Sequence, residues 1–181
     1  MFKIRKLLLF ILIAAAAVLG VRWAYGALLD RFLPLKYEED IAKYSAENGL
    51  DEYFVMAVIR AESSFDHKAH SGLARGLMQL TDDTAEWAAG KLGMEYHADM
   101  VETPDVNIKI GCWYLAYLID MYGNTETALA AYNAGPGKVN SWLKDENYSR
   151  DGKMLYEIPY GETARYVKRV AKFEKLYKKI Y

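Results

Sequence analysis

The sequence contains a single cysteine, Cys112, and therefore cannot form an internal disulfide. So little cysteine suits a protein that works outside a reducing cytoplasm without depending on oxidation, and its stability must come from packing. An excess of charge of one sign is also missing, because 23 basic residues oppose 24 acidic ones for a formal net charge of −1. Without an overall positive field, we expect no nucleic-acid partner.

The sequence also lacks sustained strand-type alternation, internal repeats, and low-complexity tracts beyond its N-terminus. Its 181 residues have an ordinary globular composition, with 52% hydrophobic and 26% charged side chains, which excludes disorder and leaves room for one domain. Beyond Pro34 the chain reads as consecutive helices with Gly, Pro and Asn at their joints. We therefore predict an all-α fold, with one compact helical domain over residues 38–181.

Residues 1–30 read as an export segment rather than as part of the folded domain, and residues 31–37 as a linker. Three basic residues, Lys3, Arg5 and Lys6, precede an apolar run over residues 7–21. The run is short for a bilayer, but continuing past Arg22 makes up the length. We expect a single-pass anchor in the cell membrane, with the following domain outside the cytoplasm. The alternative is cleavage near residues 24–26, which would release a secreted protein.

Capping residues and glycine or proline breaks predict the helices after the linker. They run from Asp51 to about Ser63, from Asp83 to near Gly90 or Gly93, from Thr103 to Gly123, from Thr125 to Asn133, from Lys138 to Leu143, and from about Glu162 to Ile180. In the third of these, apolar residues recur at four- and three-residue steps and include Cys112. We expect that cysteine in the core.

One carboxyl group ends an apolar helix stripe. Val55, Val58, Ile59 and Glu62 occupy positions i, i+3, i+4 and i+7 of one face. Burial disfavours the ionised carboxylate and the negative end of the helix dipole acts in the same direction, so the pKa of Glu62 should be raised. Such a group can hold a proton near neutral pH. The alternative is a structural carboxylate paired with a basic side chain such as Arg75.

Two later segments offer polar groups beside small residues. Residues 71–79 form a glycine-containing loop that ends in an amide side chain, and residues 130–135 place Tyr132 and Asn133 at a helix end. Each has a simple structural explanation, namely a chain turn for the loop and a packed tyrosine with a capping asparagine for the helix end. Taken singly, neither segment indicates a function.

Taken in order, these segments resemble the soluble-type lytic transglycosylases, a bacterial family with a lysozyme-like catalytic domain, over roughly residues 38–178. The motifs that carry the resemblance are Glu62-Ser63, Gly-Leu-Met-Gln at residues 76–79, Asn107-Ile108 with Gly111 and Tyr114-Leu115, Ala-Tyr-Asn-Ala-Gly at residues 131–135, and Ile-Pro-Tyr-Gly-Glu-Thr at residues 158–163 followed by Tyr166-Val167. The resemblance implies that Glu62 is the catalytic acid and base. It also implies that the sugar cleft involves Ser71, Met78, Gln79, Tyr132, Asn133, Glu162 and Tyr166.

The reaction implied by the resemblance needs one carboxyl group and no cofactor or metal. Protonated Glu62 would protonate the oxygen linking N-acetylmuramic acid to N-acetylglucosamine in peptidoglycan glycan strands, and would then act as base while a 1,6-anhydro ring closes. A goose-type lysozyme hydrolase and a non-catalytic peptidoglycan-binding module are the alternatives. Most glycosidases use a second acid, but the residues near this segment, Asp66, Asp82 and Asp83, lie among turn or capping positions and are expected to be structural.

Other patterns are weaker. His67 and His70 lack a recognised set of metal ligands around them, and Ser63 and Ser64 lack the context of a serine nucleophile. Lysines at positions 168, 172, 175 and 179 follow one face of the last helix; a solvated face is expected, with contact to anionic lipid or wall polymers as the alternative. The 15 tyrosines and four tryptophans allow stacking on sugars, although such rings usually belong to the core. Other cell-wall proteins are further candidate partners.

Overall fold

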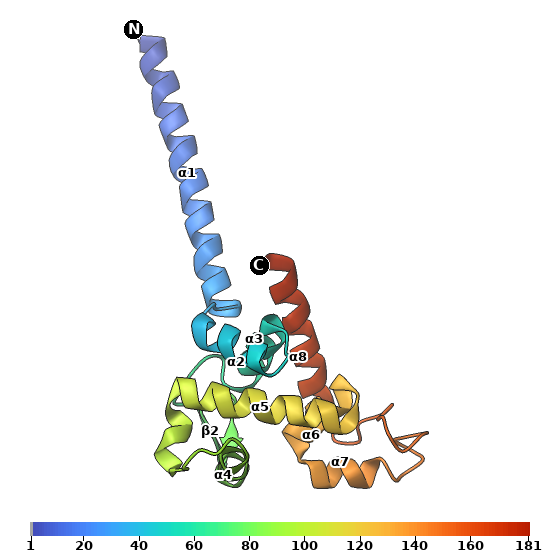
Figure 1. The fold of residues 1–181 in the computed structure, drawn as a ribbon. Coiled ribbons are helices and arrows are strands. Elements are labelled where there is room, and N and C mark those ends of the chain that lie inside the picture. Colours follow the sequence, from blue (N-terminus) through green and yellow to red (C-terminus); the bar gives the residue numbers. More distant parts are fainter. Residues whose placement is uncertain (1) are drawn as a thin grey trace. The chain divides into compact units, whose positions relative to one another are not determined.

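The computed structural model describes residues 2–181. Met1, the first residue of the predicted export segment, and the side chains of Phe2, Lys3 and Leu7 lie outside the described part. The chain divides into two units, Met1–Leu35 and Lys36–Tyr181 (Figure 1). In the first unit, helix α1 covers Phe2–Phe32 and so extends two residues beyond the predicted segment. Its stretch Ile4–Phe32 is long and apolar enough to cross a membrane, a property that a signal sequence shares.

The second unit is built almost entirely of helices. They are α2 (Glu38–Glu47), α3 (Glu52–Glu62), α4 (Asp82–Lys91), the 3₁₀ helix η1 (Ala98–Glu102), α5 (Pro104–Tyr122), α6 (Thr125–Ala134), α7 (Pro136–Trp142) and α8 (Gly161–Ile180). Three two-residue strands, β1 (His70–Ser71), β2 (Ala74–Arg75) and β3 (Leu80–Thr81), form a small antiparallel sheet in the order β1-β2-β3. The all-α prediction is confirmed, and strands this short are too brief to produce an alternating pattern.

Most predicted helix ends are confirmed, but two predicted caps are wrong. Asp51 caps α3 by accepting a hydrogen bond from the Phe54 N–H at 3.0 Å. Helix α4, however, is capped by Thr81 rather than Asp83, which lies inside the helix. Helix α6 is likewise capped by Asn124 rather than Thr125. In both cases the cap lies earlier than predicted, because the residue just outside the first turn has extended backbone and can reach the free N–H groups.

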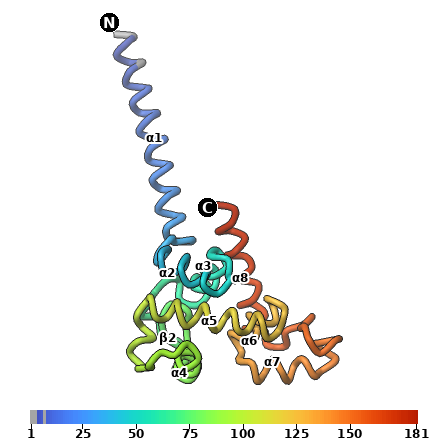
Figure 2. The backbone as a smooth tube through the Cα atoms, in the orientation of Figure 1, coloured from blue at the N-terminus to red at the C-terminus, as the bar shows by residue number. Residues whose placement is uncertain are grey.

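Helix α5 forms the centre of the second unit, and Figure 2 shows it crossing the middle of the bundle. It packs against α2, α4 and α6, while α3 packs along α8. Ile108, Cys112 and Leu115 on α5 are fully buried, as the sequence predicts. Burial also raises the pKa of the Cys112 thiol to about 12. The contacts of α6 with α5 and α8, and of α3 with α8, bring together the helices from which the candidate site is built.

Candidate active site

Glu62 is the last residue of α3 and follows a face whose apolar members, Val55, Val58 and Ile59, are all fully buried. Its own side chain is partly buried. Burial is the largest influence on this carboxyl and raises its pKa from 4.5 to about 7. The predicted direction is confirmed, and a substantial part of Glu62 is protonated at neutral pH.

Two side chains of α8 act on Glu62 in the opposite direction. The Tyr166 hydroxyl and the positive charge of Arg169 both lower the pKa of Glu62, without outweighing burial. Tyr166 is 1% exposed, and burial together with the Glu62 charge raises its own pKa well above 10, so its hydroxyl stays neutral. That hydroxyl makes no hydrogen bond of ordinary geometry within the described residues. It is therefore a neutral donor close to a carboxyl group that changes its charge.

The structural alternative for Glu62 was a paired carboxylate. Arg75 forms ion pairs elsewhere, with Asp82 and with Glu102 at 3.5 Å. The cation that acts on Glu62 is Arg169, whose guanidinium lies 5.8 Å from the centre of the Tyr166 ring. The pKa of Glu62 is thus raised despite this cation, because the effect of burial is larger.

Gln79 ends the glycine-containing loop in an unusual backbone conformation. Its φ of 48° is in the left-handed region that a residue with a side chain rarely adopts. The side chain Nε2 donates to the carbonyl oxygens of Ala69 and Gly76, each at 2.9 Å, which fixes the direction of the amide. Its Oε1 is buried and has no partner within the described residues. A buried acceptor without a donor is costly, so this oxygen is suited to accept a hydrogen bond from a ligand.

Met78 lies beneath the loop, with its side chain fully buried against Gly111. An added Cβ on Gly111 would come within 2.9 Å of the Met78 Cβ, so the close approach requires glycine there. The Met78 carbonyl accepts a hydrogen bond from the Tyr132 hydroxyl at 2.8 Å. Of the residues predicted for the cleft, Met78 therefore contributes its backbone and its packing.

Tyr132 connects this loop to Glu62. Its hydroxyl donates to the Met78 carbonyl. Burial, and secondly the charge of Glu62, raise the pKa of Tyr132 well above 10. The structure thus brings Glu62, Met78, Tyr132 and Tyr166 together. Gln79 is held within the loop by its hydrogen bonds to Ala69 and Gly76, and the remaining predicted residues Ser71, Asn133 and Glu162 are exposed.

Asn107 holds the loop in place, a role that the sequence did not predict, since Asn107 enters the sequence analysis only as part of a motif. It is completely buried in α5, where its Oδ1 accepts from the Met78 N–H at 2.7 Å and its Nδ2 donates to the Val101 carbonyl at 2.7 Å. The same Nδ2 lies 3.2 Å from the Arg75 carbonyl. An amide among the apolar residues of a helix face is the signal that could have identified it.

The nearby acidic residues have structural contacts. Asp66 accepts from the Lys68 N–H at 2.9 Å, as in a turn. Asp82 binds Arg75 and accepts from the Tyr96 hydroxyl at 2.7 Å, and these contacts hold its pKa below the ordinary range. Asp66 and Asp82 thus make the turn and ion-pair contacts that a structural carboxylate would make. Across residues 2–181 no cluster of three His, Cys, Asp or Glu side chains could hold a metal ion.

Comparison with known proteins identifies relatives of the second unit. The family described as "Transglycosylase SLT domain" matches residues 39–155. The soluble lytic murein transglycosylase of Salmonella typhimurium is 34% identical over 168 residues, covering 90% of this chain and 26% of that protein. Among solved structures, an inactive mutant of the lytic transglycosylase Slt from Pseudomonas aeruginosa aligns with a TM-score of 0.73 at 34% identity, covering 83% of this chain and 25% of that one.

A second solved structure is the 70 kDa soluble lytic transglycosylase of Escherichia coli, which aligns with a TM-score of 0.71 at 30% identity and covers 91% of this chain and 27% of that one. The chain therefore spans about a quarter of the length of the relatives it matches. The residues matched by the family include α3 through α6, which carry Glu62, Met78, Gln79 and Tyr132, whereas Tyr166 on α8 lies beyond them.

Proposed function

The chain belongs to the transglycosylase SLT family, and from this membership we propose that residues 38–181 are the catalytic domain of a peptidoglycan lytic transglycosylase. The observation that carries the proposal is Glu62, a carboxyl group with a pKa raised to about 7 and neutral hydroxyl groups around it. A group with this pKa exists in both protonation states near neutral pH, so it can act first as acid and then as base.

In the first step, protonated Glu62 gives its proton to the oxygen that links N-acetylmuramic acid to N-acetylglucosamine. The bond from that oxygen to the muramoyl C1 breaks, and the oxygen of the substrate's own 2-acetamido group bonds to C1. The second carboxylate that most glycosidases require is thereby replaced by the substrate. We propose that the Gln79 Oε1, a buried acceptor without a partner in the described residues, accepts a hydrogen bond from an N–H or hydroxyl group of the substrate.

In the second step, the Glu62 carboxylate takes the proton from the muramoyl C6 hydroxyl. The C6 oxygen attacks C1 and displaces the acetamido oxygen, which closes the 1,6-anhydro ring and returns Glu62 to its protonated state. Tyr166 supports this exchange because its hydroxyl can donate to the carboxylate and thereby stabilise the charged form. Tyr132 keeps the Met78 carbonyl engaged and so holds the loop beside Glu62.

The proposal is tested by digesting purified peptidoglycan and weighing the products. Wild-type protein should release muropeptides that are lighter by one water than hydrolysis products, and Glu62→Gln should release none. Glu52→Gln is the matched control, because Glu52 is an exposed residue of the same helix. Products of hydrolysis mass would favour the goose-type lysozyme alternative. Full activity of Glu62→Gln would contradict the assignment of Glu62 itself, and absence of activity in every variant would favour a binding module.

For the first unit, we propose that residues 1–30 anchor the protein in the cell membrane, that residues 31–37 act as linker, and that the catalytic domain lies outside the cytoplasm. The support is the apolar helix Ile4–Phe32 and the basic residues that precede its apolar run. N-terminal sequencing of the mature protein separates the two outcomes. An intact N-terminus supports the anchor, and a new N-terminus after residues 24–26 means a secreted enzyme.

A further inference from the structure

Helix α8 carries a row of basic side chains along its exposed side. Arg165, Lys168, Lys172, Lys175 and Lys179 recur at three- and four-residue steps, so they share one side of the helix, which we call the basic face. All five are exposed, whereas the opposite side of α8 is buried where it packs along α3 (Figure 1). Residues 36–181 carry 18 basic and 23 acidic side chains, and α8 holds seven of the basic and only two of the acidic ones. The positive charge of this unit is therefore concentrated on one helix.

No ion pair within the described residues involves the basic face. Lys178, which lies beside it, pairs with Asp51 at 3.3 Å and with Glu174 at 2.7 Å. The negative end of the helix dipole accounts for a lysine in the last turn, such as Lys179, but its effect does not extend further back along the helix. Like charges three and four residues apart repel one another, so an anion outside the unit would relieve this repulsion.

The surroundings of the basic face indicate which anion fits. Because residues 36–181 carry more acidic than basic side chains, the unit as a whole has no field that attracts a free anionic polymer. A lipid surface differs, because a membrane-spanning α1 would hold the unit beside it at a high effective concentration. Residues 33–37 separate the end of α1 from the start of α2, and five residues reach at most about 18 Å. At such a range a local group of lysines is sufficient for attraction to anionic lipid.

We propose that the basic face of α8 binds the anionic headgroups of the membrane that α1 spans, rather than only facing solvent as the sequence predicts. The lysine ammonium groups and the Arg165 guanidinium bind lipid phosphates. The inference rests on the proposed membrane anchor and not on the proposed reaction. It adds an orientation to that anchor, because contact along α8 determines which side of the catalytic unit faces the membrane, whereas a linker alone leaves the unit free to turn.

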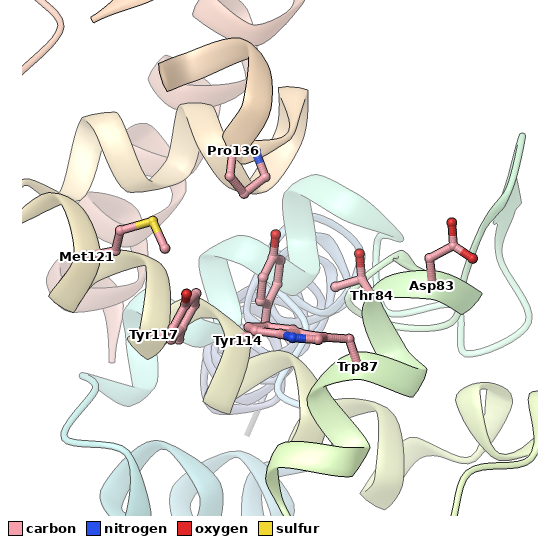
Figure 3. A pocket seen from close by; sticks show the side chains of 7 residues that line it. All are labelled: Asp83, Thr84, Trp87, Tyr114, Tyr117, Met121 and Pro136. Atoms are coloured by element: carbon pink, nitrogen blue, oxygen red, sulfur yellow. The ribbon is translucent and has the colours of Figure 1, made fainter. Parts of the chain in front are cut away.

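The opposite end of the unit provides internal controls. Figure 1 shows α4 and α7 there, away from the C-terminus of α8. Figure 3 shows the aromatic pocket that lies between α4, α5 and α7 and that is lined in part by Trp87 and Tyr117. Lys91 is the last residue of α4 and Lys144 follows α7, and both are exposed. Contact of the basic face with a membrane would leave these two lysines in solvent.

The test measures how fast each lysine is acetylated by a water-soluble reagent, with mass spectrometry as readout. Full-length protein is inserted into nanodiscs of phosphatidylcholine, or of two parts phosphatidylcholine to one part phosphatidylglycerol. Headgroup contact, and the protons that an anionic surface attracts, both slow the reaction. Lys172, Lys175 and Lys179 should react at least about threefold more slowly in the anionic discs, and high salt should abolish the difference. Lys91 and Lys144 should react equally in both kinds of disc.

A pair of variants tests whether the protection depends on the charges of the basic face. Lys172→Gln combined with Lys175→Gln should weaken the contact about thirtyfold, so Lys179 should lose its protection in the anionic discs. The control combines Lys91→Gln with Lys144→Gln, which removes the same charge elsewhere and should leave Lys179 protected. All four substituted positions are exposed, so neither variant alters the packing of the core.

The outcomes separate the lipid contact from the anchor. Equal acetylation in both discs, in protein that an alkaline wash does not remove, would overturn the lipid contact. Protection of the basic face by soluble polyphosphate and not by anionic lipid would also overturn it, by assigning the face to a polymer. Protein that the wash removes from the discs would contradict the anchor instead. Vesicles of the anionic mixture are then added to the released protein: protection of the same lysines supports the lipid contact without an anchor, and no protection overturns both.

Discussion

The free energy of unfolding of Glu62→Gln, minus that of the wild type, should be larger at neutral pH than in acid. In the unfolded chain this carboxyl titrates near 4.5, and in the folded chain near 7. Between these values the folded state holds more protons than the unfolded state, so the wild-type free energy of unfolding falls as pH rises. The stabilisation that Glu62 contributes to the folded state is fully present below pH 4.5 and is lost as pH rises through 7.

The size of the effect follows from the two pKa values. Their difference corresponds to about 3 kcal/mol of unfolding free energy. Urea unfolding of full-length protein in detergent, followed by tryptophan fluorescence at a series of pH values, gives the stability of Glu62→Gln minus that of wild type. This difference should be flat below pH 4.5, rise by about 3 kcal/mol up to pH 7, and be flat above it.

Glu52→Gln serves as control, because it removes an exposed carboxyl group from the first turn of the same helix. A stability difference between Glu62→Gln and wild type that is the same in acid and at neutral pH would refute the reasoning. It would mean that Glu62 ionises at its ordinary pKa and that burial at the end of α3 has no effect on its proton.

Three further substitutions test the surroundings of the site. Tyr166→Phe removes a hydroxyl that lowers the pKa of Glu62, so the fall of kcat/KM at high pH should move to higher pH; an unmoved profile would contradict this contact. Asn107→Ala leaves a buried backbone N–H and carbonyl unpaired and should lower the unfolding free energy by about 2–4 kcal/mol in urea titration. Gly111→Ala should cost about 1–3 kcal/mol through overpacking, whereas Gly90→Ala, which meets open space, should not destabilise.

The position and protonation of Glu62 could be predicted from the sequence because they depend on local periodicity. Three apolar residues on the same helix face fix where its side chain emerges, and burial then sets the direction of the pKa shift. For α4 and α6, the cap that the sequence predicts lies one or two residues after the cap in the structure. Each of these helix starts has several polar residues that could act as the cap. The sequence does not show which of their side chains accepts a hydrogen bond from a backbone N–H of the first turn.

The support of the site could not be predicted in the same way, because it depends on contacts between distant segments. Asn107 binds the loop at Met78, 29 residues earlier, and Tyr132 binds the same residue from 54 residues later. The aromatic pocket similarly joins α4 to α5 and α7. In the sequence Trp87 and Tyr117 are two aromatics among many, and only the packing of their helices leaves one of them partly exposed.

The buried thiol of Cys112 gives the molecule a reporter of its own motions. Burial raises its pKa to about 12, so in the closed state it has neither the access nor the thiolate character to react with maleimides or oxidants. Alkylation then requires α5 to separate from its neighbours, and the labelling rate counts those openings. The opening of α5, the helix whose Asn107 holds the loop of residues 71–79, can thus be measured in the natural sequence without inserting a probe.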